Sequence, residues 1–106
     1  MTRGERVGLN EAFFREVNER VKEVNETFST LTGTGDFVCE CGEATCVERI
    51  HVPMEDFSRI REDAALFAIV PGHEQPDVED VVEEHGDYSV VRKHEGGPAE
   101  LARELA

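Results

Sequence analysis

The sequence predicts a single α+β domain with a long N-terminal helix and a small, mainly antiparallel sheet. Apolar residues recur at helical spacing over residues 9–31. Residues 47–52 and 66–70 are runs of strand length, rich in apolar and β-branched residues. Glycine and proline separate these segments, which indicates turns between them. A chain of 106 residues can bury one modest core, so one domain is expected.

Residues 9–31 are expected to form one long helix after a flexible N-terminus, residues 1–8. Apolar side chains three or four residues apart share one face of a helix. Such a stripe can pack on the helix's own domain or on a second copy of the chain, so a homodimer through helix 9–31 stays open. The stripe consists of Phe14, Val17, Val21, Val24, Phe28 and Leu31.

Residues 36–93 are expected to form the core of the domain. Strand-forming residues flank a group of cysteines, which predicts a hairpin with the cysteines at its tip. In the strand that leaves the tip, Ile50 and Val52 share one face and His51 lies on the other. Residues 66–70 and 87–92 are expected to add strands to the same sheet.

Two or three shorter helices are expected beside this sheet. Pro53 can occupy the first position of one helix, and Pro76 can open another that ends at Gly86. The acidic run Glu79–Glu84 would lie on the outer face of that helix, as a solvated surface or a docking surface. Residues 94–106 are expected to be a tail or a short helix.

The three cysteines lie within eight residues in the pattern C-x-C-x4-C, at Cys39, Cys41 and Cys46. Thiolates bind Zn²⁺ tetrahedrally, and four ligands complete a structural site. Gly42 permits the tight turn that would bring the sulfur atoms together. We therefore predict one Zn²⁺ per chain, with iron as the alternative metal because thiolates also suit iron. A redox switch based on the Cys39/Cys41 pair and inert buried cysteines are the alternatives to a metal site.

His73 is the predicted fourth metal ligand. It lies in the turn Pro71-Gly72-His73-Glu74, directly after the strand expected beside the cysteine hairpin. Glu74 could instead orient a ligand through a hydrogen bond. The alternative fourth ligands are a water molecule, a residue from a second chain, and the side chains of His51, His85, His94, Glu40, Glu43 and Glu74.

The net charge of −13 restricts the possible partners. An acidic surface repels polyanions, so direct binding of nucleic acid is not expected, whereas a basic protein partner is compatible with it. No apolar run reaches membrane-spanning length, and the N-terminus lacks the apolar stretch of a signal peptide. We expect a cytoplasmic protein without membrane contact. Thiols stay reduced in the cytoplasm.

The sequence contains no complete catalytic motif. The H-x-E…P-C-x-x-C, H-E-x-x-H and G-x-S-x-G patterns are absent. Three thiolates would also donate much charge to a metal and weaken it as a Lewis acid. The leading interpretation is a regulatory or protein-interaction module with a structural zinc. A redox or metal sensor comes second, and a zinc hydrolase with an open coordination position third.

Three segments resemble an uncharacterised family of small bacterial proteins common in high-GC Gram-positive lineages. They are the helix residues 10–20, the C-E-C-G…C motif within residues 37–46 and the P-G-H-E motif at residues 71–74. The similarity covers roughly residues 9–93, with the same order and spacing of motifs. It implies that Cys39, Cys41, Cys46 and His73 are characteristic residues. Members are sometimes similar to segments attached to signalling domains, and this association is what favours a role in signalling.

Overall fold

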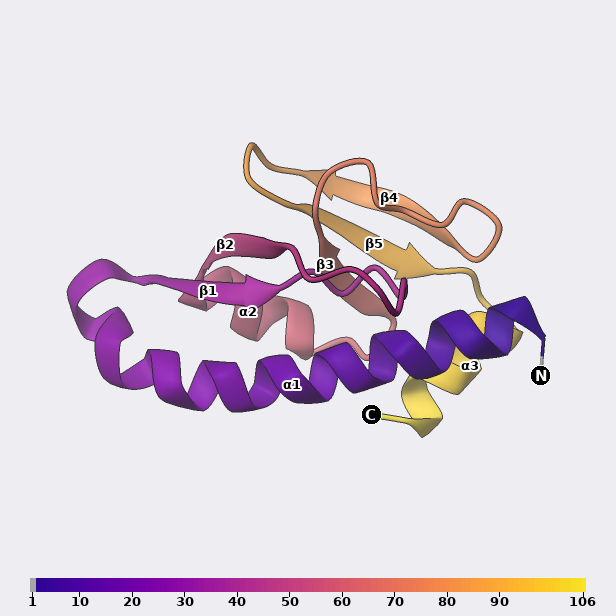
Figure 1. Ribbon diagram of the computed structural model, residues 1–106, viewed down its shortest axis with the longest axis horizontal. Coiled ribbons are helices and arrows are strands. Elements are labelled where there is room, and N and C mark those ends of the chain that lie inside the picture. The colour runs from indigo at the N-terminus through magenta and orange to yellow at the C-terminus, as the bar shows by residue number, and fades with distance from the viewer. Residues whose placement is uncertain (1) are drawn as a thin grey trace.

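The computed structural model describes residues 2–106, with the side chains of residues 2–23 and 33–106. It confirms the α+β class, because the described chain has three helices and two antiparallel sheets (Figure 1). The elements are α1 (Arg3–Thr32), β1 (Thr34–Val38), β2 (Arg49–Pro53), α2 (Met54–Arg61), β3 (Leu66–Ile69), β4 (Glu79–Glu84), β5 (Ser89–Lys93) and α3 (Gly97–Glu104). Helix α1 runs along one side of the molecule, and α3 lies beside its N-terminal half.

Helix α1 begins at Arg3 rather than at residue 9, so residues 3–8 are helical and not the expected flexible segment. The hydroxyl of Thr2 accepts the amide hydrogen of Glu5 at 3.1 Å and donates to the Glu5 carboxylate at 3.1 Å. The first bond satisfies a backbone amide of the first turn, as an N-cap does, and the second holds the Glu5 side chain against Thr2. Gly33 follows the helix with φ 71°, the left-handed conformation typical of a helix end.

The predicted apolar stripe of α1 is only partly covered by the domain. Phe14, Val17 and Val21 are partly buried, and Val21 packs against the main hydrophobic cluster. The stripe positions beyond residue 23 lie outside the described side chains. Phe13, next to the stripe, is 61 % exposed.

The most buried described side chains of α1 are mostly polar. Val7, Glu11, Arg15 and Asn18 are at most 7 % exposed, and their spacings of four, four and three residues place them on one helix face. A search for apolar periodicity overlooks this face, because charged and amide side chains seldom become buried without partners. The partners of the polar side chains come from β1, the cysteine loop (residues 39–48), the α2–β3 connection, α3 and the three-stranded sheet.

Strands β1 and β2 form the predicted antiparallel hairpin, and the cysteine loop connects them. Ile50 and Val52 are buried while His51 is exposed, as the alternation predicted. The hairpin forms a sheet of its own. The other sheet has the strand order β3-β5-β4, so the expected single sheet with residues 66–70 and 87–92 is divided in two.

Residues 79–84 form strand β4, so the predicted helix from Pro76 to Gly86 is wrong. β-Branched valine side chains favour strands over helices, and β5 offers an antiparallel partner. A register shift between Val81 and Glu83 interrupts the strict alternation that indicates a strand in a sequence. The acidic run therefore lies on an edge strand, where charged side chains discourage pairing with other chains.

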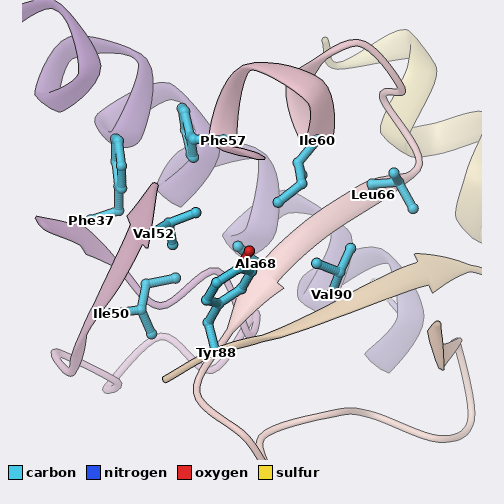
Figure 2. Close-up of a cluster of buried hydrophobic side chains, with 9 residues drawn as sticks. All are labelled: Phe37, Ile50, Val52, Phe57, Ile60, Leu66, Ala68, Tyr88 and Val90. Atoms are coloured by element: carbon cyan, nitrogen blue, oxygen red, sulfur yellow. The ribbon is translucent and has the colours of Figure 1, made fainter. Parts of the chain in front are cut away.

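Two hydrophobic clusters cover opposite faces of the three-stranded sheet, because successive side chains of β3 point in opposite directions. The first cluster joins the sheet to α2 and the cysteine hairpin (Figure 2). In it, the rings of Phe37 and Phe57 stack at 3.9 Å between centroids. The second cluster contains Cys39 and Cys41 beside Phe67, so the cysteine loop packs on the other face. Within the part of the chain that the structure describes, no helix combines the length and apolar character needed to span a bilayer.

Candidate metal centre

Four side chains from two distant segments converge at one place. Cys39, Cys41 and Cys46 come from the cysteine loop, and His73 comes from the turn after β3. Their potential ligand atoms all lie within 4.8 Å of one another. Cys39 and Cys41 are buried, while Cys46 and His73 are partly exposed. This group could hold a metal ion.

The distances within the group match the edges of a tetrahedral site. Zinc lies about 2.3 Å from cysteine sulfur and about 2.0–2.1 Å from histidine nitrogen, which places S and N ligands about 3.6 Å apart at tetrahedral angles. The Nδ1 atom of His73 is 3.6 Å from the Sγ atom of Cys39 and 3.8 Å from that of Cys46. The imidazole nitrogen that faces the thiols is thus at a suitable distance for joint coordination.

Backbone hydrogen bonds give the cysteine loop its shape. The amide of Cys39 donates to the Glu48 carbonyl at 2.9 Å, which closes the loop at its base. The amide of Cys46 donates to the Glu43 carbonyl at 3.0 Å and forms a turn inside it. Gly42 has φ 81°, a left-handed conformation that reverses the chain directly after Cys41.

Backbone amides also point at all three sulfur atoms. The amide of Val70 donates to Cys39 Sγ at 3.2 Å. The amides of Glu43 and Glu48 donate to the sulfur atoms of Cys41 and Cys46, respectively, two residues before each donor. Such bonds lower the pKa of a thiol by favouring the thiolate, which is the form that binds metals.

The thiols also influence one another without a metal. A hydrogen bond from Cys39 lowers the pKa of Cys41 to about 5, and the same bond raises the pKa of Cys39. Burial raises the pKa of Cys46. One thiolate, at Cys41, is therefore available near neutral pH before a metal arrives.

His73 reaches the cysteine loop because the chain turns sharply after β3. Its amide donates to the Val70 carbonyl at 3.0 Å, and Gly72 has φ 94°. Its Nε2 atom lies 2.9 Å from a carboxylate oxygen of Glu48. A carboxylate bonded to one ring nitrogen fixes the tautomer and leaves the other nitrogen free to bind a metal. Glu48 thus orients His73 towards the thiols.

Glu48 could not be recognised from the sequence. The chain has 24 acidic residues, so a carboxylate near the cysteines carries no information by itself. Glu74, the residue that the sequence suggested for the orienting role, instead lines the pocket next to the site.

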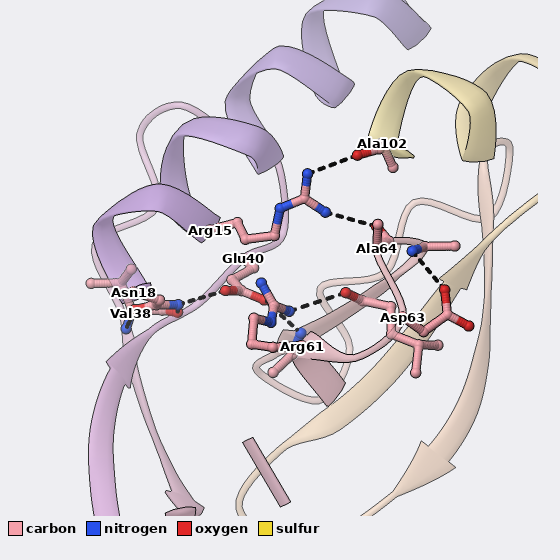
Figure 3. Close-up of polar contacts among 11 residues, drawn as sticks. Arg15, Asn18, Val38, Glu40, Arg61, Asp63, Ala64 and Ala102 are labelled. Atoms are coloured by element: carbon pink, nitrogen blue, oxygen red, sulfur yellow. Dashed lines mark hydrogen bonds and ion pairs between the residues drawn. The ribbon is translucent and has the colours of Figure 1, made fainter. Parts of the chain in front are cut away.

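Glu40 anchors the cysteine loop through polar contacts (Figure 3) and is not part of the metal-binding group. It is fully buried, and its Oε1 atom accepts hydrogen bonds from Arg61 Nη2 at 2.8 Å and from the Ala68 amide at 2.9 Å. Its Oε2 atom accepts a hydrogen bond from Asn18 Nδ2 at 2.8 Å. Asn18 also exchanges two hydrogen bonds with the backbone of Val38. The residue between Cys39 and Cys41 is thus held by α1, α2 and β3 together.

The other histidines considered as ligands lie elsewhere. His51 pairs with Asp36 on the exposed face of β2. His85 lies 3.0 Å from a Glu83 carboxylate oxygen, and His94 lies at the end of β5. None of these three belongs to the group formed with the cysteines.

An open pocket of about 450 Å³ adjoins the metal-binding group. Cys41, Cys46 and His73 are among its lining residues, and Cys39 is not. Its rim includes Val47, which is 84 % exposed, and the carboxylate residue Glu43. Solvent therefore reaches the group from one side.

Comparisons with known proteins add no assignment: no protein-family model, no curated protein and no solved structure matches this chain. The resemblance carried by the C-E-C-G…C and P-G-H-E motifs stays a prediction.

Proposed function

We propose that this protein binds one Zn²⁺ per chain through Cys39, Cys41, Cys46 and His73. The observation that carries the proposal is the convergence of three sulfur atoms and one imidazole nitrogen within 4.8 Å. Thiolate and imidazole ligands in a tetrahedral arrangement suit zinc better than calcium or magnesium, which prefer oxygen. The amide bonds to sulfur and the Glu48–His73 pair support the same assignment.

The proposed role of the metal is structural. Four protein ligands would fill a tetrahedral zinc site and leave no position for a reactive water molecule. The ion would add to the contacts that already join the cysteine loop to the turn after β3, namely the bond from the Val70 amide to Cys39 Sγ and the Glu48–His73 pair. Apolar residues make up only 39 % of this short chain, so its hydrophobic core is small and a bound metal would add to the free energy of folding.

The biological role we propose is a non-enzymatic regulatory or interaction module in the cytoplasm. Its net charge of −13 favours a basic protein partner over nucleic acid. Self-association would use the exposed apolar side chains Leu9 and Phe13 of α1, since Val21 packs against the main hydrophobic cluster. A monomeric mass at micromolar concentration, measured by light scattering, would overturn the homodimer part of this proposal.

Elemental analysis of untagged protein purified without chelator tests the metal site. We expect one zinc per chain. Iron in place of zinc would correct the identity of the metal, and absence of metal with freely reactive thiols would overturn the site.

Two histidine variants provide a matched comparison. His73→Ala is expected to lose zinc to a competing chelator at a lower concentration than the parent protein. His51→Ala removes a histidine that is nearer to the cysteines in sequence but lies on the exposed face of β2. It should retain zinc as the parent does.

A further inference from the structure

The pocket beside the metal-binding group gives solvent unequal access to the three thiols. Cys46 is partly exposed and lines the pocket, and Cys41 lines it next to Cys46. Cys39 and Cys41 are both 1 % exposed, but Cys39 does not line the pocket and its sulfur accepts the amide hydrogen of Val70. A small oxidant that enters from solvent therefore meets Cys46 first and Cys41 next.

We propose that Cys46 is a peroxide-reactive thiol whose oxidation produces a Cys41–Cys46 disulfide and expels the metal. This inference rests on the zinc site proposed above. It assigns the disulfide to a pair that differs from Cys39/Cys41, the pair that the C-x-C spacing suggests. The sulfur atoms of Cys41 and Cys46 lie within 4.8 Å of each other, so a local movement of the loop brings them to bonding distance.

The oxidant is a peroxide, and the reaction balances in two steps. The Cys46 thiolate attacks one oxygen of hydrogen peroxide, the O–O bond breaks, and hydroxide leaves and takes up a proton as water. The sulfenic acid formed on Cys46 is then attacked by the Cys41 thiolate. The S–O bond breaks, a second hydroxide leaves and is protonated, and the disulfide forms. Two thiolates lose two electrons in total, and peroxide becomes two water molecules.

Loss of two thiolates would leave Cys39 and His73 as the remaining ligands. Two ligands do not complete a structural zinc site, so the ion would leave and its part in joining the cysteine loop to the turn after β3 would be lost. A dithiol reductant together with zinc would restore the site. The proposed interaction module would thus have a reversible, peroxide-dependent state.

Stoichiometric hydrogen peroxide applied to the full-length, zinc-loaded protein tests the inference. Zinc content is measured first, then released zinc is followed with a chromogenic chelator and disulfides are mapped by peptide mass spectrometry after alkylation. We expect complete release of zinc, a Cys41–Cys46 disulfide and an alkylated Cys39. Retention of zinc under excess peroxide, or a Cys39–Cys41 disulfide, would overturn the inference. Protein that contains no metal at the start would instead overturn the proposed function, and its disulfide map would still decide which pair oxidises first.

Two serine variants distinguish the effect of losing any metal ligand from the effect of losing Cys41, the thiol that forms the disulfide with Cys46. Cys39→Ser and Cys41→Ser each remove one thiolate from the metal site. We expect Cys39→Ser to form the intramolecular disulfide under peroxide. Cys41→Ser should lose that product and accumulate a sulfenic acid on Cys46, which dimedone traps. Equal disulfide formation in both variants would contradict the order of oxidation.

Discussion

Two glycines with positive φ differ in what surrounds them. Gly42 has φ 81°, and a Cβ atom there would lie 2.7 Å from a Val7 methyl carbon and 3.1 Å from the Val7 carbonyl oxygen. Gly72 has φ 94°, and a Cβ atom there would meet nothing within 4 Å. Both glycines adopt the left-handed conformation. Only at Gly42 is there also no room for a side chain, because the loop approaches α1 closely at that point.

Replacing each of these two glycines by alanine is predicted to destabilise the protein by a different amount. Gly72→Ala should lower the free energy of unfolding by about 1–2 kcal/mol, the cost of placing an L-residue in the left-handed region. Gly42→Ala should lower the free energy of unfolding by ~1–3 kcal/mol more than Gly72→Ala does, since α1 or the loop must shift to accept the methyl group. Urea unfolding of both variants at one fixed free zinc concentration measures the difference. Equal losses would show that the close packing of the loop on α1 is absent in solution.

The contact between Glu48 and His73 predicts a specific effect on metal affinity. Glu48→Gln leaves all four proposed ligands in place but weakens the acceptor that orients the imidazole, so zinc affinity should fall about 10–100-fold. Glu43→Gln is the matched control, because Glu43 also lies in the loop and lines the pocket but does not contact His73. Competition with a chelator of known affinity measures both variants. Similar affinities for the two would rule out the orienting role.

The ligand set was easier to predict from the sequence than its supporting residues. Clustered cysteines and a histidine in a glycine turn are unusual in a short chain that binds no metal, which is why Cys39, Cys41, Cys46 and His73 could be proposed. Glu40, Glu48 and Asn18 act through contacts with distant residues, and their types are common on any polar surface. Only the three-dimensional arrangement distinguishes them from solvated side chains.

At the scale of elements, α1 is joined to the sheet by a buried charged cluster. Glu11 of α1 and Glu79 of β4 both contact Nζ of Lys93 of β5, and all three are at most 2 % exposed. Burial and the nearby Glu79 carboxylate raise the pKa of Glu11 to about 9 from 4.5, although Lys93 opposes the shift. Glu11 is therefore protonated in the folded protein at neutral pH, and it shares the cluster with one lysine and one carboxylate.

This cluster predicts that stability falls as pH rises. Between pH 4.5 and about 9 the folded state retains a proton on Glu11 that the unfolded chain has released. Raising the pH through this window therefore costs up to about 1.4 kcal/mol per pH unit. Glu11→Gln removes the titration, so its free energy of unfolding relative to the parent should increase with pH.

The comparison is made by urea unfolding at pH 6, 7 and 8 with zinc-loaded proteins, so that proton release from the zinc thiolates affects both equally. Glu16→Gln, at an exposed position of the same helix, is the control and should run parallel to the parent. A parallel curve for Glu11→Gln as well would contradict a protonated Glu11.

Among the elements, strand β4 was the one predicted with the wrong type. Pro76 and Gly86 lie at the two ends of the segment, where they are also typical of the ends of a helix. The bulge interrupts the alternation of apolar and polar residues that would indicate a strand. What makes the segment a strand is the partner β5, whose position depends on the rest of the fold. The existence and type of the hairpin, β3 and α1 were predicted correctly because their patterns are local: an alternation, an apolar run and a helical period, respectively. The start of α1 was placed six residues too late.

At the scale of the whole molecule, three of the four proposed ligands are local and one is not. Cys39, Cys41 and Cys46 lie within eight residues, so an unfolded chain can still offer three thiolates to zinc. His73 joins them only when β3 and the turn after it are in place. Zinc binding therefore depends on folding chiefly through His73, and binding to the unfolded chain reduces the stabilisation that a ligand can supply.

This division predicts how stability depends on free zinc. If zinc bound only the folded state, each tenfold rise in free zinc above the dissociation constant would add about 1.4 kcal/mol to the free energy of unfolding. We expect a clear but smaller slope for the parent, because the unfolded cysteine segment competes for the ion. His73→Ala should still bind zinc weakly, but its free energy of unfolding should hardly change with free zinc. The reason is that three local thiolates bind zinc almost equally well in the folded and the unfolded chain. Urea unfolding in zinc-buffered solutions measures both slopes, with His51→Ala as the control. A variant slope equal to that of the parent would mean that His73 does not link the metal to the fold.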